Sequence, residues 1–386
     1  MNFELSEDQR AFQQSAREFA AGEFAPHAAR WDAEGVFPRE ALAAAGELGF
    51  CGLYAAEAYG GLGLTRLDAT LVFEELAAAC PSTTAFLTIH NMATWMVTHF
   101  AHPMVALRWG PLLASGKGLA SYCLTEPGSG SDAASLRTTA RREGDDYILT
   151  GSKAFISGAG ATDALVVMAR TGGPGAEGIS ALLVGADSPG MRFGRKEEKM
   201  GWNSQPTRAI HFEDVRVPAS HLLGAEGEGF KIAMRGLDGG RINIATCSIG
   251  AAQGALDAAT RHMHARSQFK RKLSSFQALQ FKISDMATEL VAARQMVRMA
   301  ASRLDQGLPQ ASVYCAMAKQ FATDAGFRIC NEALQIHGGY GYTREYPLER
   351  LLRDARVHQI VEGTNEIMRV IVSRRMLEIN PTEDIR

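Results

Sequence analysis

The carboxylate of Glu362 is a candidate for chemistry, because it lies between apolar residues and a glycine. Glu362 follows Ile360 and Val361 and precedes Gly363. A carboxylate in this setting acts either as a helix cap or as a base in an apolar pocket. In the second case burial raises its pKa towards neutrality, where a general base is most effective. The residues around Glu362 leave both interpretations open.

Two other segments carry groups that suit a planar or phosphorylated cofactor. Residues 122–132 (YCLTEPGSGSD) are an expected strand that runs into a loop rich in Gly, Ser and Thr. Such a loop offers backbone N–H groups and hydroxyls to a flavin edge or a phosphate, or it is a plain surface turn. Phe155 and Ser157 are two residues apart and would share one strand face. The alternative there is a core aromatic residue beside an edge serine.

Two segments nearer the C-terminus complete the set of candidates. Residues 266–277 (RSQFKRKLSSFQ) hold four cations within seven positions. These cations could bind a pyrophosphate, or they form a solvated basic turn. Residues 335–354 (QIHGGYGYTREYPLERLLRD) contain a glycine pair, which permits a close approach of the backbone to a ligand.

Residues 128–133 (GSGSDA) match the dinucleotide-binding motif G-x-G-x-x-A. A Rossmann turn needs a helix next, with its N-terminus at the pyrophosphate. The following residues 134–139 (ASLRTT) include adjacent β-branched residues and no apolar stripe. We therefore reject a Rossmann fold.

Composition limits the classes of protein. The chain has 386 residues, 46% apolar and 21% charged, which suits two or three globular domains. A net charge of −2 without a long basic run argues against nucleic acid as a partner. The six cysteines are scattered and are expected to be reduced thiols, and no metal site is expected. Without a secretory leader or an apolar run of about 18 residues, a cytoplasmic protein is expected, although a removed organellar leader stays possible.

The elements that must position the candidates follow a simple order. Residues 1–117 are predicted to be helical, with a capping box at Ser6 and Gln9. Residues 118–226 show short β-branched runs broken by Gly, Asp and Ser, with a break expected at Gly151 and Ser152. Residues 227–386 return to helices, and an apolar stripe from Ile283 to Leu304 predicts a helix of a bundle. A further helix is predicted over residues 311–337.

Together the four segments resemble the acyl-CoA dehydrogenase family over essentially the whole chain. The segments YCLTEPGSGSD and QIHGGYGY…RD are similar to two signatures of that family. The resemblance implies an α+β, mainly α fold, with an N-terminal helical domain, a central β-barrel-like domain and a C-terminal four-helix bundle. It also implies a bound FAD and the α,β-desaturation of an acyl-CoA.

The resemblance assigns the base to one of two places. In most members it lies in the segment matched by Glu362 to Glu366, and in isovaleryl-type members near Gly240. A glycine at 240 and a glutamate at 362 imply the commoner arrangement, with Glu362 as the catalytic residue. The backbone N–H of Glu362 and a ribityl hydroxyl of FAD would stabilise the thioester oxygen. Substrate contacts are implied for Ser131, Asp238, Arg241, Glu362 and Gly363.

The resemblance likewise implies the FAD contacts. Those expected near the flavin are Tyr122, Cys123, Leu124, Thr125, Gly130, Ser131, Phe155, Ile156, Ser157, Thr364, Asn365 and Glu366. Those expected near the adenine and pyrophosphate are Arg266, Gln268, Phe269, Phe276, Gln277, Gln335, Ile336, His337, Gly338 and Gly339. Members often have a Gly and a Pro where this chain has Lys270, Arg271 and Lys272, which leaves the contacts of this loop open.

The resemblance also implies partners and a substrate class. FAD bridges subunits in the family, so a homo-oligomer, usually a tetramer, is expected, together with electron-transfer flavoprotein as the electron acceptor. Residues 199–208, 236–245 and 89–92 are most similar to isobutyryl-CoA dehydrogenases of valine breakdown. The alternatives are 2-methylbutyryl-CoA or butyryl-CoA as substrate, a flavin-dependent acyl-CoA oxidase, and a non-catalytic acyl-CoA-binding protein.

Overall fold

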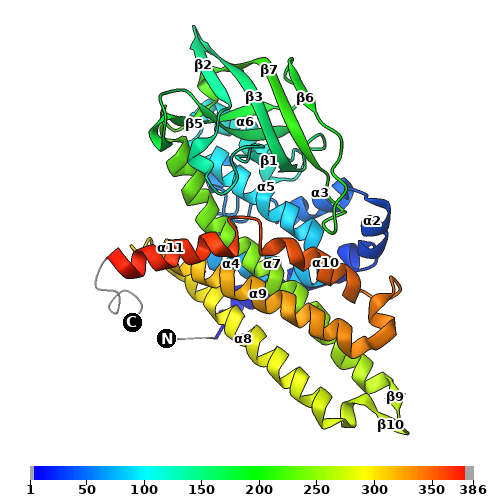
Figure 1. The fold of residues 1–386 in the computed structure, drawn as a ribbon. Helices are drawn as coiled ribbons and strands as arrows, with labels where there is room; N and C mark the ends of the chain where they lie inside the picture. Colours follow the sequence, from blue (N-terminus) through cyan, green and yellow to red (C-terminus); the bar gives the residue numbers. More distant parts are fainter. Residues whose placement is uncertain (1–3, 379–386) are drawn as a thin grey trace.

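The computed structural model describes residues 4–378, so the outermost parts of the predicted terminal domains, residues 1–3 and 379–386, lie outside it. Helices come first, a sheet follows, and long helices end the chain (Figure 1). The first group of helices is α1 (Glu7–Phe19), α2 (Ala28–Glu34), α3 (Arg39–Glu47), α4 (Arg66–Ala79), α5 (Pro81–Phe100) and α6 (Pro103–Ala114). The capping box predicted at Ser6 is confirmed, because its hydroxyl accepts the N–H of Gln9 at 3.1 Å and the Gln9 side chain accepts the N–H of Ser6.

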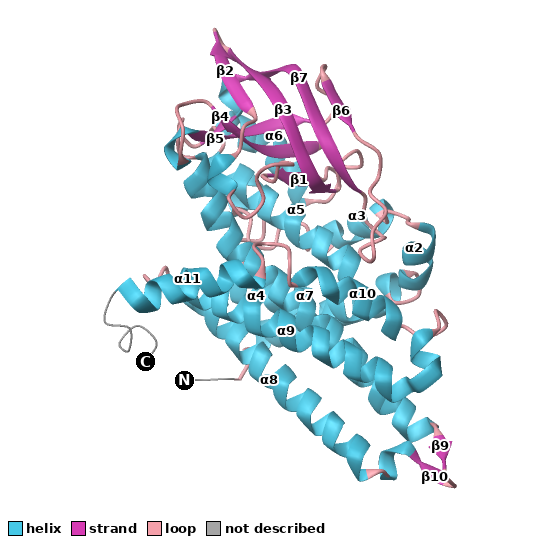
Figure 2. Cartoon of the chain, in the orientation of Figure 1, coloured by secondary structure: helices cyan, strands magenta, loops and turns pink. Residues whose placement is uncertain are grey.

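The sheet lies at one end of the molecule (Figure 2). Its strands are β1 (Ala120–Cys123), β2 (Thr139–Glu143), β3 (Asp146–Ser157), β4 (Ala164–Arg170), β5 (Ile179–Gly185), β6 (Met191–Phe193), β7 (Thr207–Pro218) and β8 (Leu222–Leu223). Their order is β6-β7-β3-β2-β4-β5-β8, and β1 pairs in parallel with β4. Within the described residues β6 and β8 end this path, so the barrel-like sheet is not closed.

One detail of the strand prediction was wrong. Gly151 and Ser152 do not separate two strands, because both stay paired to β7 inside one long strand, β3, after a shift of register. A second irregularity lies between Lys153 and Ile156, where Phe155 has φ 58°. Because a bulge interrupts the alternation of side chains, the shared strand face of Phe155 and Ser157 stays a prediction.

The second group of helices forms a bundle that runs away from the sheet (Figure 1). It consists of α7 (Gly229–Ala265), α8 (Gln277–Asp305), α9 (Ala311–His337), α10 (Leu348–His358) and α11 (Asn365–Glu378), with the two-stranded hairpin β9 (Ser267–Gln268) and β10 (Arg271–Lys272) between α7 and α8. The predicted stripe on α8 is confirmed, since Met286, Leu290, Ala293 and Val297 are buried in one core with α7 and α9. The helix predicted over residues 311–337 is α9.

The remaining structural predictions concern the glycine-rich loop, the thiols, membrane spans and the domain boundaries. No α-helix follows residues 128–133, where the chain makes a short 3₁₀ turn (Ala133–Ser135) and enters β2, as the rejection of a Rossmann fold required. All six cysteines are free and buried. Residues 4–378 contain no helix long and apolar enough to cross a membrane. The boundaries drawn at 117/118 and 226/227 stay predictions.

Candidate active site

Glu362 lies in the short link between α10 and α11. The link begins as a turn, in which the N–H groups of Ile360 and Val361 both donate to the carbonyl of Val357, at 2.8 and 3.0 Å. Glu362 then takes φ 56° and Gly363 φ 91°. Left-handed backbone costs a residue other than glycine about 1–2 kcal/mol. Such strain is kept where the surrounding structure fixes it, often at functional sites.

The Glu362 carboxylate is directed at helix α7. A β-carbon added at Gly240 would lie 2.9 Å from Cδ of Glu362 and 3.4 Å from its Oε1. The separation from Cδ is shorter than a normal contact, so a side chain at position 240 and the present place of the Glu362 carboxylate exclude each other. The glycine on α7 is therefore what lets the link bring its carboxylate against this helix.

Burial dominates the electrostatics of Glu362. The residue is half-buried, but its Oε2 is fully buried and accepts no hydrogen bond from the described residues. Burial raises the pKa of Glu362 to about 7, although the positive charges of Arg241 and Lys319 oppose the rise. The carboxylate is thus poised to take up and release a proton near neutral pH.

The two cations are held on neighbouring helices. Arg241, on α7, is buried and pairs with Asp238 at 2.6 Å, and Asp238 also accepts the hydroxyl of Ser312 at 2.8 Å. Lys319, on α9, is fully buried and donates to the carbonyl of Gly363 at 2.8 Å. Burial lowers the pKa of Lys319 to about 7, which the charge of Glu362 opposes.

Polar atoms without a partner gather around the carboxylate. Besides Oε2 of Glu362, the buried atoms for which residues 4–378 supply no partner include the hydroxyl of Tyr122, Nη1 of Arg66 and Nε of Arg241. Burial raises the pKa of Tyr122 well above its usual value, and the charge of Glu362 adds to the effect. Buried polar groups in native proteins normally have partners, so this cluster points to a polar ligand beside Glu362.

Arg66 comes from the first group of helices and lies over Tyr54, whose pKa is raised by burial and further by the charge of Glu362. Its guanidinium carbon lies 3.5 Å from the centroid of the Tyr54 ring, and a β-carbon at Gly239 would meet the guanidinium at 2.8 Å. The hydroxyl of Tyr54 accepts a hydrogen bond from the amide of Asn243 at 3.0 Å. Neither Tyr54 nor Arg66 was predicted from the sequence, because only the packing of the first group of helices on α7 brings them together.

The loop that follows β1 is tied to β3 by a buried ion pair. Nζ of Lys153 donates to the carbonyl of Leu124 at 3.0 Å and to Oε1 of Glu126 at 2.8 Å. The Glu126 carboxylate also accepts the N–H groups of Arg137 and Thr138, at 2.6 and 2.9 Å. Lys153 and Glu126 were not predicted as site residues. A charged residue inside an apolar strand was the signal that could have found them.

The same contacts bring two predicted segments together. The N–H of Ala154 donates to the carbonyl of Thr125 at 2.9 Å, which sets the loop after β1 beside the end of β3. There Phe155 is 69% exposed, while Ile156 is buried and Ser157 half-buried. An aromatic ring held outside the core at a bulge offers its face to another planar group.

The other residues predicted beside these two segments vary in exposure. Cys123 and Leu124 are buried, Tyr122 and Thr125 are half-buried, and Gly130 and Ser131 are exposed. At the start of α11 the hydroxyl of Thr364 accepts the N–H of Ile367 at 3.3 Å. Asn365 is buried behind it and Glu366 is exposed.

The predicted adenine and pyrophosphate contacts lie elsewhere. Figure 1 shows the hairpin β9–β10 at the end of the bundle opposite the sheet. Phe269, at its tip, is 88% exposed, and Arg271 lies 3.9 Å over the ring of Phe276. Gln268 is exposed too, and Gln277 opens α8 beside the hairpin. One chain therefore does not bring this group to Glu362.

The end of α9 joins this distant group. The ring of His337 stacks on His262 with centroids 4.2 Å apart, and Arg266 lies 5.5 Å from the Tyr340 ring. The other predicted residues of this segment are Gln335, Ile336, Gly338 and Gly339, which lie at or just after the end of α9.

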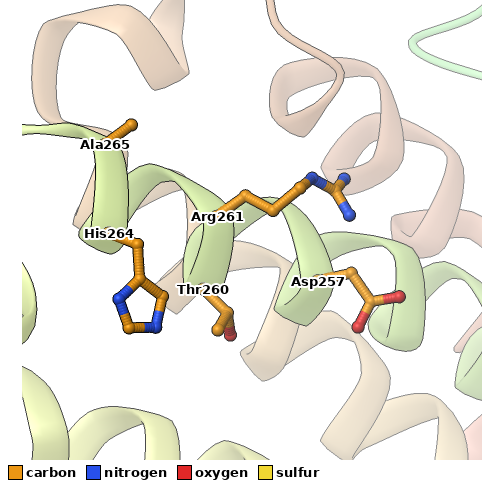
Figure 3. Close-up of a pocket in the computed structure, with 5 residues that line it drawn as sticks. All are labelled: Asp257, Thr260, Arg261, His264 and Ala265. Atoms are coloured by element: carbon orange, nitrogen blue, oxygen red, sulfur yellow. The ribbon is translucent and has the colours of Figure 1, made fainter.

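An open hollow of about 560 Å³ also lies near the distant group, on the outer face of α7. Figure 3 shows that its lining side chains project from successive turns of this single helix. They are Asp257, Thr260, Arg261, His264 and Ala265. None of them was a predicted site residue, and the hollow does not include the surroundings of Glu362.

Three family models match nearly the whole chain. The N-terminal domain of acyl-CoA dehydrogenases matches residues 6–117, the middle domain residues 121–215 and the C-terminal domain residues 227–377.

Individual relatives match at full length. The chain is 53% identical over 374 residues to the mitochondrial isobutyryl-CoA dehydrogenase of Bos taurus, covering 97% of this chain and 90% of that protein. It is 54% identical over 373 residues to the mitochondrial isobutyryl-CoA dehydrogenase of Dictyostelium discoideum, covering 96% and 90%. The solved butyryl-CoA dehydrogenase of Megasphaera elsdenii has a TM-score of 0.94 and 38% identity, covering 98% of this chain and all of that one.

Proposed function

Because the chain belongs to the acyl-CoA dehydrogenase family, whose members depend on FAD, we propose that Glu362 is the base of an α,β-desaturation of a short branched acyl-CoA. The proposed reaction converts isobutyryl-CoA to methacrylyl-CoA in valine catabolism. One observation carries the role of Glu362. Its carboxylate has a pKa of about 7 and lies among buried polar atoms that lack partners within residues 4–378.

The proposed chemistry needs a base of this kind. The α-proton of a thioester is weakly acidic, so its removal requires a carboxylate whose pKa is raised by desolvation. Glu362 takes this proton, while bound FAD supplies the acceptor for the hydride that leaves the β-carbon. General base catalysis of this kind contributes about 10²–10⁴-fold in rate.

The carbonyl oxygen of the substrate needs hydrogen-bond donors as negative charge develops on it. Among the residues that the structure describes, no oxygen accepts a hydrogen bond from the N–H of Glu362, which supports the proposal that this group binds the thioester oxygen. Asp238, Arg241, Ser131 and Gly363 are proposed to contact the substrate around it. Of these, Gly363 is next in the chain and Arg241 acts on the pKa of Glu362.

The residues present suit FAD. The loop after β1, fixed by Lys153, and the start of α11 offer backbone groups and hydroxyls, and Phe155 offers an exposed ring. Residues 122–125, 130–131, 155–157 and 364–366 are proposed to hold the flavin. The Arg266 to Gln277 segment and residues 335–339 are proposed to hold the adenine and pyrophosphate. Since these lie at the opposite end of the bundle, they would act on the FAD of another subunit in a homo-oligomer.

The choice of substrate rests on the relatives from Bos taurus and Dictyostelium discoideum, which are named isobutyryl-CoA dehydrogenases. Electron-transfer flavoprotein is proposed as the electron acceptor. The cytoplasmic location stays a prediction, and the two relatives are named as mitochondrial proteins.

Anaerobic reduction of the flavin by branched and straight C4–C5 acyl-CoAs tests the substrate. Isobutyryl-CoA is expected to bleach the flavin fastest, with 2-methylbutyryl-CoA and butyryl-CoA slower. Fastest bleaching by butyryl-CoA would overturn the preference for a branched chain. Peroxide formed at turnover rates without an added acceptor would instead identify an oxidase. A purified protein that takes up no FAD would identify a non-catalytic acyl-CoA-binding protein.

A further inference from the structure

We propose that Lys319 is a positioning residue, which fixes the link between α10 and α11 so that the Glu362 carboxylate faces the substrate. This inference rests on the proposed role of Glu362. It concerns a buried lysine on a different helix, in a part of the chain that contains none of the motifs from which the site was predicted.

The hydrogen bonds of Lys319 hold both sides of the same turn. Its Nζ donates to the carbonyl of Gly363 at 2.8 Å and to Oδ1 of Asn365 at 2.9 Å. Asn365 is in turn anchored to α9, because its Nδ2 donates to Thr323 at 2.9 Å and to Asp324 at 2.8 Å. The turn that starts α11 is thereby fastened to α9 directly after Glu362.

The backbone of this turn needs such a support. Glu362 and Gly363 both have positive φ, and the glutamate pays a steric penalty for it. If Lys319 were replaced by an apolar residue, the carbonyl of Gly363 would lose this hydrogen-bond donor in a protein interior. The backbone could then relax, and the carboxylate would leave its place against Gly240.

The charges around Lys319 and Glu362 determine how Lys319 affects the ionisation of Glu362. Glu362 faces Arg241 on α7 and Lys319 on α9, while Lys319 also feels Asp324 and, on α11, Glu366. Arg241 is already paired with Asp238 at 2.6 Å. Among the described residues no carboxylate lies within ion-pair distance of Lys319, which donates to two amide oxygens instead. Its ammonium therefore favours the ionised form of Glu362.

The test replaces Lys319 with Met, with Lys199→Met as a matched control. Lys199 is half-buried and donates to the carbonyl of Gln205 at 2.7 Å and to Thr207 at 2.8 Å, but it does not act on Glu362. Two quantities are measured in both variants: the rate of anaerobic flavin reduction at saturating acyl-CoA, and the titration of the Glu362 carboxyl by infrared difference spectroscopy. The Glu362 band is identified by its loss in Glu362→Gln.

For Lys319→Met we expect retained FAD, flavin reduction slower by on the order of 10²-fold, and a Glu362 titration shifted upward from about 7. Lys319→Arg keeps the charge and should restore the titration. Lys199→Met should lose thermal stability and keep the wild-type titration. If Lys319→Met does not fold, Lys319→Gln, which keeps a donor but no charge, replaces it and must show the same upward shift.

A Lys319 variant with wild-type titration and rate would overturn the inference. Failure of the proposed function gives a different result, since the wild-type flavin would then be reduced by none of the acyl-CoAs. The infrared titration needs no reaction, so in that case it still decides whether Lys319 controls the Glu362 carboxyl.

Discussion

At the scale of single residues, burial and nearby positive charges have opposite effects on the pKa of Glu362. Burial disfavours the carboxylate, and Arg241 and Lys319 restore part of its stability. The outcome is a pKa near 7 for a group whose ordinary pKa is about 4.3. A base so tuned is ionised in a useful fraction of molecules at neutral pH, yet it is a far stronger proton acceptor than an exposed glutamate.

This balance predicts the pH dependence of the reaction. Only the ionised carboxylate can accept the α-proton, so kcat/KM should rise with pH and level off above an apparent pKa of about 7. The measurement is kcat/KM for isobutyryl-CoA across that range. A flat profile, or a rise centred at the ordinary pKa of a glutamate, would contradict the raised pKa.

At the scale of elements, the site is a meeting of helices from distant parts of the chain. The link between α10 and α11 supplies Glu362, α7 supplies Gly240 and Arg241, and α4 adds Arg66. Close approach depends on glycine, because a β-carbon at position 240 would collide with the carboxylate. The approach of the link to α7 and the placement of the Glu362 carboxylate therefore both require a glycine at position 240.

The variant Gly240→Ala tests that requirement, with Gly250→Ala on the same helix as its control. At Gly250 an added β-carbon would meet the backbone carbonyl of Glu74 and, at 2.7 Å, Cβ of Ala77, so this variant overpacks α7 and should destabilise the protein by about 1–3 kcal/mol. At Gly240 the added β-carbon meets only the carboxylate end of Glu362, so this variant should lose less stability. Flavin reduction per FAD-loaded subunit should collapse only in Gly240→Ala. Equal rates in the two variants, measured with their thermal melting temperatures, would show that position 240 does not constrain Glu362.

Local signals explain which elements the sequence could predict. The capping box at Ser6 and the bounds of α9 depend on residues a few positions apart. The continuity of β3 through Gly151 depends instead on pairing with β7, and the ion pair of Lys153 with Glu126 on a loop from β1. Glu362 was identifiable from its neighbours and the family resemblance. Its cations and the packing of Gly240 against it required the fold.

At the scale of the whole molecule, the two groups of predicted FAD contacts lie apart, one where the sheet meets the helices and the other at the far end of the bundle (Figure 1). Phe155 and the loop after β1 lie by the sheet, whereas Arg266 and Phe269 lie at the far hairpin. If FAD uses both groups, it must bridge subunits. Assembly into an oligomer is then required for binding the cofactor.

This arrangement predicts linkage between assembly and cofactor. Dilution that dissociates the oligomer should release FAD at the same protein concentration, as followed by light scattering and flavin fluorescence. Arg266→Ala should weaken FAD binding while it leaves the flavin-side residues and their acyl-CoA contacts in place. A monomer that retains its full content of FAD would contradict the bridging arrangement.

The central claim is that Glu362 removes the α-proton, and Glu362→Gln tests it most directly. Glutamine has nearly the same shape and cannot accept the proton. The variant should bind FAD as the wild type does, and isobutyryl-CoA added without oxygen should leave its flavin oxidised while it bleaches the wild type. Bleaching of the variant at the wild-type rate would contradict the assignment of the base.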